Sequence, residues 1–197
     1  MSVRRLNVGC GRFTREGWIN LDRRPGPGVD VVADLDAVRA TPIPLPDESV
    51  DEFLLSHVIE HLEDPLGLMQ ELWRIAKPGA IAAIRVPHGA SDDAWEDQTH
   101  RRPYFVGSFG FFAQPWYWRA DYGYRGDWQP ERITLLVDRA LVTDLDAPRF
   151  FRRIQAERNL VREMVAELRA VKPARAADRS LLVAPAVTIA PVDPEPA

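Results

Sequence analysis

Short apolar runs, most of them closed by glycine, proline or an acidic residue, divide the first half of the chain. Their lengths and flanking residues predict strands at residues 5–8, 17–22, 28–35, 50–56 and 80–86. Between the last two, apolar residues recur at helical spacing, which predicts a helix from about Val58 to Ala76. Pro65 interrupts this helix and Lys77-Pro78-Gly79 ends it. Alternating strands and helices predict an α/β fold with a Rossmann-like, doubly wound, mostly parallel sheet.

The second half of the chain is less regular. We expect a sixth strand with a turn at residues 132–145 and a helix at 148–157. Residues 159–168 have apolar positions at helical spacing, but we interpret them as a last strand because the sheet needs one, for a total of about seven. After residue 172 the composition turns to Ala, Pro, Val and Asp. The expected organisation is a domain at 1–172 and a mobile tail at 173–197.

The segment after the fifth predicted strand, residues 89–128, lacks regular periodicity and is rich in aromatic residues. An aromatic insertion of this length is typically a functional loop, so we expect a lid or an acceptor-binding segment. Some of its rings should instead fill the core. Trp116, Tyr117 and Trp118 are consecutive and cannot all face inward, so some are available to an acceptor or to a partner chain. A homodimer is therefore left open.

Composition excludes several classes of function. A chain of 197 residues accommodates one domain of this kind. A net charge of −4 disfavours a nucleic-acid partner, and no apolar run approaches the ~18–20 residues of a membrane span. Cys10 is the only cysteine, which rules out an internal disulfide and suits a reducing compartment. Without a secretory signal pattern at the amino terminus, we expect a soluble, cytoplasmic protein.

Residues suited to nucleoside binding follow the predicted strands. The first strand ends in Gly9-Cys10-Gly11, the second in Asp22, the third in Asp34-Leu35 and the fourth in Ser56-His57. The carboxyl ends of parallel strands line one crevice, where glycines allow close approach of the backbone and a carboxylate accepts the ribose hydroxyls. The order of these residues predicts a nucleoside site.

These residues also carry a family resemblance. The chain resembles class I methyltransferases of the type 11 group in the segments LNVGCG (6–11), GWINLD (17–22), ADL (33–35), LPDESVDEFLLSHVIEHL (45–62), ELWRIAKPGA (71–80) and IAAIRVPH (81–88). The resemblance implies S-adenosyl-L-methionine as cofactor and S-adenosyl-L-homocysteine as its product. It also implies the cofactor contacts: Gly9, Cys10 and Gly11 at the methionine part, Asp22 at the ribose, Asp34 and Leu35 at the adenine, and Ser56 and His57 under the sulfonium.

Two features depart from the family pattern. Asn7 stands where the family usually has an acid, so a charged contact with the cofactor ammonium group is missing. Asn7 stays a candidate cofactor-binding residue. Only residues 12–16 separate Gly11 from Gly17, whereas a parallel crossover with a helix needs a dozen residues or more. We therefore expect the first helix to be reduced to a turn.

The run His57-Val58-Ile59-Glu60-His61 matches the H-x-x-E-H pattern of a class of zinc peptidases, on a predicted helix. The resembled family commonly carries similar residues after its fourth strand, and no third ligand is evident in the sequence. We interpret the match as coincidental and expect no metal.

Candidate catalytic residues follow the fifth strand. His88 ends that strand, and Asp97 and His100 belong to a D-x-T-H element resembling one in related enzymes. A neutral imidazole is able to take a proton from an acceptor hydroxyl or amine. The alternatives, a structural His88 and a surface turn at 97–100, stay open.

Together these features predict methyl transfer from S-adenosylmethionine to oxygen or nitrogen of a small-molecule acceptor, such as a sugar or a natural-product intermediate. One alternative is a cofactor-binding scaffold or regulatory partner without transfer activity, suggested by Asn7 and the reduced helix. A third reading, an NAD-dependent oxidoreductase, is weaker because GCGRFT lacks the third spaced glycine of G-x-G-x-x-G.

Overall fold

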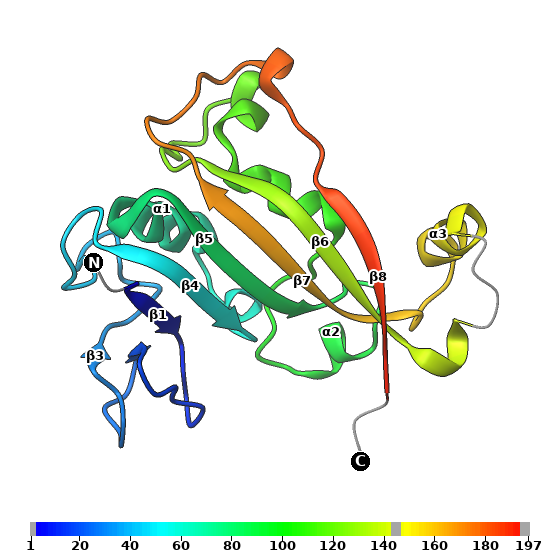
Figure 1. The fold of residues 1–197 in the computed structure, drawn as a ribbon, viewed down its shortest axis with the longest axis horizontal. Coiled ribbons are helices and arrows are strands. Elements are labelled where there is room, and N and C mark those ends of the chain that lie inside the picture. Colours follow the sequence, from blue (N-terminus) through cyan, green and yellow to red (C-terminus); the bar gives the residue numbers. More distant parts are fainter. Residues whose placement is uncertain (1–2, 143–146, 194–197) are drawn as a thin grey trace.

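A computed structural model describes residues 3–142 and 147–193 of the chain, with one eight-stranded sheet at its centre (Figure 1). The strands are β1 (Arg5–Val8), β2 (Ile19–Asp22), β3 (Val31–Val32), β4 (Val50–Ser56), β5 (Ala76–Pro87), β6 (Trp128–Asp138), β7 (Val161–Ala170) and β8 (Ala186–Val192). The helical segments are η1 (Ile59–His61), α1 (Pro65–Ile75), α2 (Asp93–Glu96), η2 (Val106–Phe112), η3 (Gln114–Trp118), η4 (Arg139–Leu141), α3 (Ala147–Ala156) and η5 (Arg179–Leu181), where η marks a 3₁₀ turn.

The strand order is β3-β2-β1-β4-β5-β7-β6-β8, and β7 alone among these strands runs antiparallel to its neighbours. The predicted α/β class with a mostly parallel sheet is confirmed, with one strand more than expected. The chain leaves β1 towards β2 and β3 on one side and returns to β4 and β5 on the other. Such a reversal of strand order is where open α/β sheets bind ligands, at the carboxyl ends of the strands.

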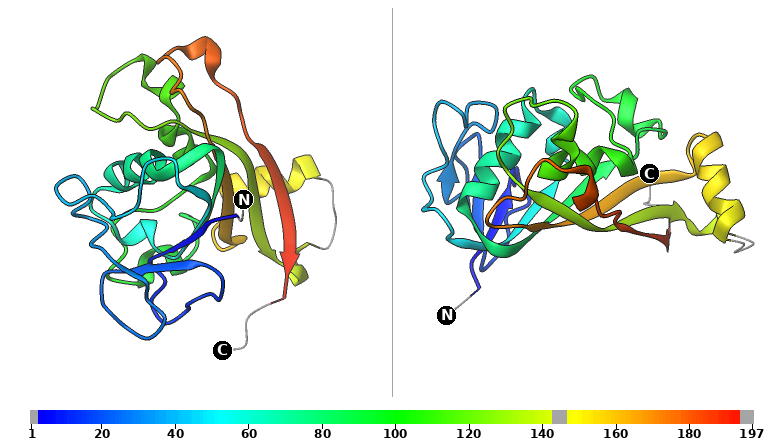
Figure 2. Two further views of the ribbon diagram at one scale, coloured as in Figure 1. Left: turned by 60° about the vertical axis from the view of Figure 1, so that its left-hand side comes forward. Right: turned by 90° about the horizontal axis from the view of Figure 1, so that it is seen from above.

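The helical segments lie on one side of the sheet (Figure 2). Residues along β5 alternate accordingly: Ala82 and Ile84 are buried, whereas Ile81, Ala83 and Arg85 are half-buried. This alternation is typical of a sheet that packs on one face only. The connections between β1, β2, β3 and β4, residues 9–18, 23–30 and 33–49, contain turns and no helix. In the first of them this confirms the predicted loss of the first helix.

Helix α1 begins at Pro65, which fixes its own φ and needs no hydrogen-bond partner for a backbone N–H at this position. The Asp64 carboxylate caps the helix by accepting from the Gly67 N–H at 2.8 Å. The helix predicted for residues 58–76 is therefore confirmed in two pieces, η1 and α1. It ends one residue earlier than expected, because Ala76 is already paired with Val50 in the sheet.

The aromatic segment divides between core and surface, as expected. Trp128 is fully buried, donates its indole N–H to the Met69 carbonyl at 2.8 Å and packs edge-on against Phe53 with ring centroids 5.6 Å apart. Tyr117 is buried, whereas Trp116 and Trp118 on either side are 39% and 37% exposed. The three consecutive rings do not all face inward, which confirms that prediction.

The two later predicted strands are present, but their first and last residues differ from the prediction. Residues 161–170 form β7, as we interpreted them; Met164 and Leu168 are both buried because positions four apart share a face in a strand as well as in a helix. The sixth strand runs from Trp128 to Asp138. The predicted extension to residue 145 falls partly on residues 143–146, which lie outside the described part of the chain.

The carboxyl-terminal segment carries structure that the sequence analysis did not predict. Strand β8 pairs in parallel with β6, from Ala186 beside Arg132 to Val192 beside Asp138. Its Pro191 is tolerated because β8 is an edge strand with no neighbour on its outer side among the described strands. The Ala- and Pro-rich composition concealed this strand, and residues 194–197 lie outside the described residues.

Candidate active site

The turn after β1 combines two glycines with positive φ angles. Gly9 has φ +64°, and a Cβ there would lie 2.7 Å from Cγ2 of Val58. Gly11 has φ +51°, and a Cβ there would meet nothing within 4 Å. Gly9 is therefore required for packing against the segment after β4, whereas Gly11 borders open space where a ligand can approach the backbone.

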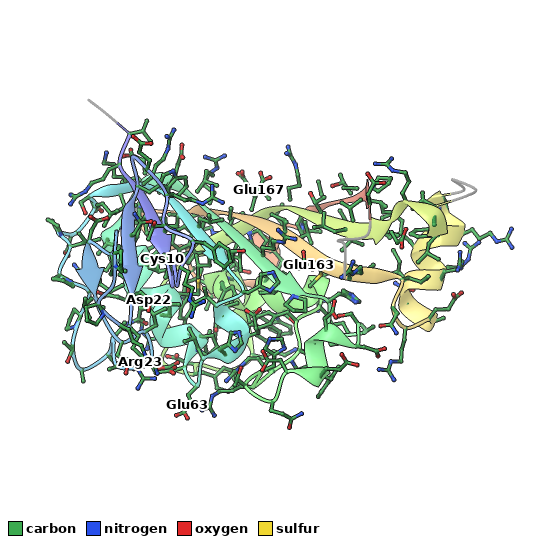
Figure 3. The ribbon with its side chains drawn as sticks, turned by 90° about the horizontal axis from the view of Figure 1, so that it is seen from below. Cys10, Asp22, Arg23, Glu63, Glu163 and Glu167 are labelled. Atoms are coloured by element: carbon green, nitrogen blue, oxygen red, sulfur yellow. The ribbon has the colours of Figure 1, made fainter. Side chains whose placement is uncertain are left out.

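Asp22 lies beside this turn, at the end of β2. One carboxylate oxygen accepts from the Gly11 N–H at 2.8 Å and the other from the Arg24 N–H at 3.0 Å. Figure 3 shows Cys10 and Asp22 next to each other. Cys10 itself is buried, and burial, followed by the nearby Asp22 charge, raises the pKa of its thiol. The structure thus brings together the glycine turn and the carboxylate that the sequence placed on neighbouring strands.

Asn7 is buried beneath the same turn. Its amide nitrogen donates to the Phe13 carbonyl at 2.9 Å and to Oδ1 of Asn20 at 3.0 Å. Asn20 in turn accepts from the Arg15 N–H at 2.8 Å. A carboxylate cannot donate, so the usual acid would lose both contacts of Asn7. Asn7 ties down the connection that replaces the first helix, which explains this departure from the family pattern.

The two residues expected near the adenine differ in exposure. Asp34 is half-buried, with one carboxylate oxygen 3.4 Å from Nε of Arg23. Leu35 is 7% exposed and belongs to the core. Their contacts with a nucleoside stay a prediction.

The end of β4 carries a charged cluster. Ser56 and His57 are exposed, and His57 has a φ of +54°. Its Nε2 lies 3.0 Å from Oε1 of Glu163, and its Nδ1 lies 3.4 Å from Oε1 of Glu60. These two carboxylates, Glu163 first, raise the pKa of His57 to about 9. His57 is therefore a cation at neutral pH and does not serve there as a proton acceptor.

Glu163 is a site residue that sequence reasoning missed. It lies on β7, opposite Pro87 of β5, and also accepts from Nε of Arg85 at 2.6 Å (Figure 3). No motif marks Glu163, and only the antiparallel register of β5 and β7 brings it to His57. These contacts and its partial burial make it a positioning partner of the His57 cation.

His88 is buried at the end of β5, where its ring lies edge-on to Phe105 with centroids 5.4 Å apart. Burial lowers its pKa, so the ring is neutral near pH 7. Its Nδ1 accepts from the Ala90 N–H at 3.2 Å, which leaves the ring hydrogen on Nε2. His88 lines a cavity of about 720 Å³ with residues of η2, α3, β6 and β8, including Phe105, Val106, Phe151, Ile154 and Val187.

The Asp97–His100 element forms a tight turn. Oδ1 of Asp97 accepts from both the N–H and the hydroxyl of Thr99 at 2.7 Å, and these bonds lower the pKa of Asp97. His100 stacks edge-on against His61 with ring centroids 4.7 Å apart. The structure therefore groups His100 with the segment after β4, whereas His88 lies against Phe105.

The H-x-x-E-H match is also clarified. His57 precedes the η1 turn and binds Glu163, whereas His61 lies within η1 and bonds to Oγ1 of Thr99 at 2.9 Å. The two histidines do not form the helical pair of the pattern. A different group does come together, because Glu60, His61 and His100 each offer a ligand atom within 4.8 Å of the others.

Comparisons with known proteins agree with this geometry. Residues 14–84 match a family model described as a methyltransferase domain. A protein of Mycobacterium sp. strain KMS, described as an uncharacterized methyltransferase, is 34% identical over 92 residues, which cover 40% of this chain. The match covers 36% of the Mycobacterium protein, so this chain spans about a third of its length.

Solved structures show the same fold at low sequence identity. A SAM-dependent methyltransferase from Archaeoglobus fulgidus has a TM-score of 0.59 and 17% identity, covering 85% of this chain and 86% of its own. The YcgJ protein of Bacillus subtilis has a TM-score of 0.54 and 12% identity, covering 88% of this chain and 93% of its own.

The match of residues 14–84 to a methyltransferase domain, together with the fold shared with a SAM-dependent methyltransferase, confirms the resemblance to class I methyltransferases found in the sequence. The cofactor of this class is S-adenosylmethionine. Among the described residues, no helix is long and apolar enough to cross a membrane.

Proposed function

We propose that this protein transfers a methyl group from S-adenosylmethionine to oxygen or nitrogen of a small-molecule acceptor. The observation that carries the proposal is that the Gly11–Asp22 contact and His88 both lie at the carboxyl ends of parallel strands of one sheet, in the order β2-β1-β4-β5. Gly9, Cys10 and Gly11 would hold the methionine part, Asp22 the ribose, and Asp34 and Leu35 the adenine. Ser56 and His57 would lie under the sulfonium, with the Glu60 and Glu163 carboxylates balancing the positive charge of His57.

The His88 cavity supports a small-molecule acceptor. Its volume of about 720 Å³ lies within the usual range of roughly 300–1,000 Å³ for ligand pockets. Its wall is mainly apolar, with Gln155, Glu157 and Arg158 from the end of α3 as the polar part. This lining suits an acceptor with an apolar body, such as a natural-product intermediate, better than a bare sugar.

Methyl transfer requires little from the protein beyond the correct placement of the cofactor and the acceptor. The bound cofactor supplies an electrophilic methyl group, and the chain aligns the acceptor atom with it. Alignment of this kind contributes a large part of the rate of bimolecular reactions in enzymes. His88, neutral and buried, is placed to hold or move a proton of the acceptor.

We further propose a cytoplasmic protein with no nucleic-acid partner. A net charge of −4 and a single buried cysteine support this assignment. The exposed Trp116 and Trp118 leave a homodimer as an alternative, which the sedimentation rate of the purified protein would reveal.

In the test, the protein is incubated with methyl-tritiated S-adenosylmethionine and a cell extract. The mixture is then separated into small metabolites, protein and nucleic acid, and the tritium in each fraction is counted. We expect label in the small-metabolite fraction, and none when the extract is omitted. Tight cofactor binding without label in any fraction would favour the scaffold alternative. A thermal shift with NAD, but none with S-adenosylhomocysteine, would favour the oxidoreductase.

Replacing Asp22 by alanine is expected to weaken S-adenosylhomocysteine binding roughly 10- to 150-fold, because charge-assisted hydrogen bonds contribute about 1.5–3 kcal/mol. Calorimetry measures this change. Glu131→Gln is the matched control. Glu131 is exposed on β6 and pairs with Arg169 on β7, so this variant should bind S-adenosylhomocysteine as tightly as the parent protein does. Unchanged affinity in a folded Asp22→Ala protein would remove Asp22 from the ribose site.

A further inference from the structure

We propose that Glu60, His61 and His100 form a binding site for a divalent transition-metal ion. One carboxylate oxygen and one ring nitrogen from each histidine lie within 4.8 Å of one another. Glu60 and His61 belong to η1, which follows β4, and His100 follows α2 in the connection after β5. The site thus joins the segments that follow two neighbouring parallel strands, and it does not depend on the proposed function.

The Glu60 carboxylate is the strongest sign of a missing ligand. Its side chain is 2% exposed, and neither oxygen has a hydrogen-bond partner among the described residues. The nearest approach, Nδ1 of His57 at 3.4 Å, lacks hydrogen-bond geometry. A buried carboxylate without hydrogen bonds is costly, and buried charges in proteins are usually paired or coordinate metals.

Both histidines are held in the tautomer that carries the ring hydrogen on Nδ1, which leaves the lone pair on Nε2; Oδ2 of Asp97 lies 3.8 Å from Nε2 of His100. The Thr99 hydroxyl donates to Asp97, so its oxygen accepts from Nδ1–H of His61 at 2.9 Å. The Ala94 carbonyl can only accept, so Nδ1–H of His100 donates to it at 3.2 Å. Metal-binding histidines typically donate their second ring N–H to a carbonyl or to a polar side chain in this way.

The donor set selects the class of ion. Two imidazole nitrogens and one carboxylate oxygen suit Zn²⁺ and neighbouring transition-metal ions, and catalytic zinc sites of the His₂Glu kind leave further positions open. Mg²⁺ and Ca²⁺ prefer oxygen ligands throughout. We commit to Zn²⁺ as the probe, with Co²⁺ as its spectroscopic substitute.

The ion would fasten η1 to the turn at residues 97–100. Main-chain contacts already link these segments, because the Arg101 N–H donates to the Glu60 carbonyl at 2.8 Å. A bound cation would also offset the buried charge of Glu60. We therefore expect metal binding to raise the thermal stability of the whole chain.

The experiment titrates Zn²⁺ into chelator-treated protein by competition with a chromogenic chelator, alongside thermal unfolding and Co²⁺ absorption spectra. We expect one Zn²⁺ per chain, a rise in the unfolding temperature, and Co²⁺ bands of a nitrogen–oxygen site. His100→Ala removes a ligand and should weaken binding by at least about 100-fold. Thr99→Val removes only the partner of His61 and should weaken it roughly 10- to 100-fold.

Two controls keep the outcome decisive. His88→Asn removes a histidine outside the cluster and should leave affinity and stoichiometry unchanged. Glu60→Gln should lose the metal and, when metal-free, unfold at nearly the same temperature as the metal-free parent, because it removes a buried carboxylate that makes no hydrogen bond together with its attraction to the His57 cation. Equal Zn²⁺ affinity in the parent and His100→Ala proteins, or no stoichiometric binding by the parent, would overturn the proposal.

Discussion

Replacing Asp127 by alanine is expected to lower the free energy of unfolding by about 3–5 kcal/mol, the usual effect of removing one partner of a buried ion pair. The Asp127 side chain is fully buried, and its two oxygens accept from Nε and Nη2 of Arg175 at 2.8 Å each. The same carboxylate accepts from the N–H of Gln114 at 3.1 Å and of Arg175 at 2.9 Å. The alanine variant would leave Nε and Nη2 of Arg175 and two backbone N–H groups without these acceptors, while Nη1 of Arg175 keeps its bond to Oε1 of Gln129 at 2.7 Å.

The pair also joins three parts of the chain: η3, the start of β6, and the segment leading to β8. Urea denaturation measures the loss of stability, and we expect an unchanged slope with a lower midpoint. The control is Asp121→Ala, because the Asp121–Arg125 pair is exposed, with 62% of each side chain accessible, and its loss should leave the midpoint nearly unchanged. If both variants unfold at the same midpoint as the parent, the Asp127–Arg175 pair does not hold the segment in place.

The elements set by local pattern were predictable from the sequence. Strand β4 spans Val50–Ser56, as predicted, because an apolar run bounded by Pro46 and His57 has few alternatives. Helix α1 follows from its apolar spacing and from Pro65. The turn in place of the first helix followed from counting residues between Gly11 and Gly17.

Elements that depend on distant pairing were not predictable. Strand β8 exists because the outer edge of β6 is available, and its half-buried residues offer a weak pattern within an Ala- and Pro-rich stretch. The Asp127–Arg175 pair spans 48 residues, and no short motif signals it. Glu163 reaches His57 only through the register of β5 and β7.

The candidate site shows the same division. Gly11 and Asp22 were found because each directly follows a strand, and the ends of adjacent parallel strands must meet. Asn7 looked like a weakened cofactor contact, and only the structure shows that its amide holds the following loop. His100 was assigned together with His88, but its ring lies against His61, which no local spacing indicated.

Replacing His88 by alanine is expected to slow single-turnover methyl transfer by about 10²–10⁴, the range for losing a group that exchanges or holds a proton at the reacting atoms. Cofactor affinity should be nearly unchanged, because Asp22, the carboxylate that we propose for the ribose, lies on β2 and His88 follows β5. The rate should also depend on pH through His88, because protonation places a hydrogen on Nδ1 and breaks the bond from the Ala90 N–H that positions the ring. Burial lowers its folded pKa below 6.5, so the neutral ring is present above that value and is lost as the pH falls through the folded pKa.

The variant His88→Gln separates the two ways in which this histidine can act. Nδ1 accepts from the Ala90 N–H, so the neutral ring presents Nε2–H to the cavity as a hydrogen-bond donor. Glutamine keeps a hydrogen-bond donor but cannot take up a proton. The rate of methyl transfer by the His88→Gln protein should therefore no longer fall at acid pH. We expect His88→Gln to recover part of the rate that His88→Ala loses, because the geometry favours donation.

A glutamine variant as slow as the alanine variant would instead make His88 the general base. A loss of less than a few-fold in both variants would return His88 to a structural role. A fall in cofactor affinity equal to the fall in rate would place His88 in the nucleoside pocket, contrary to this assignment.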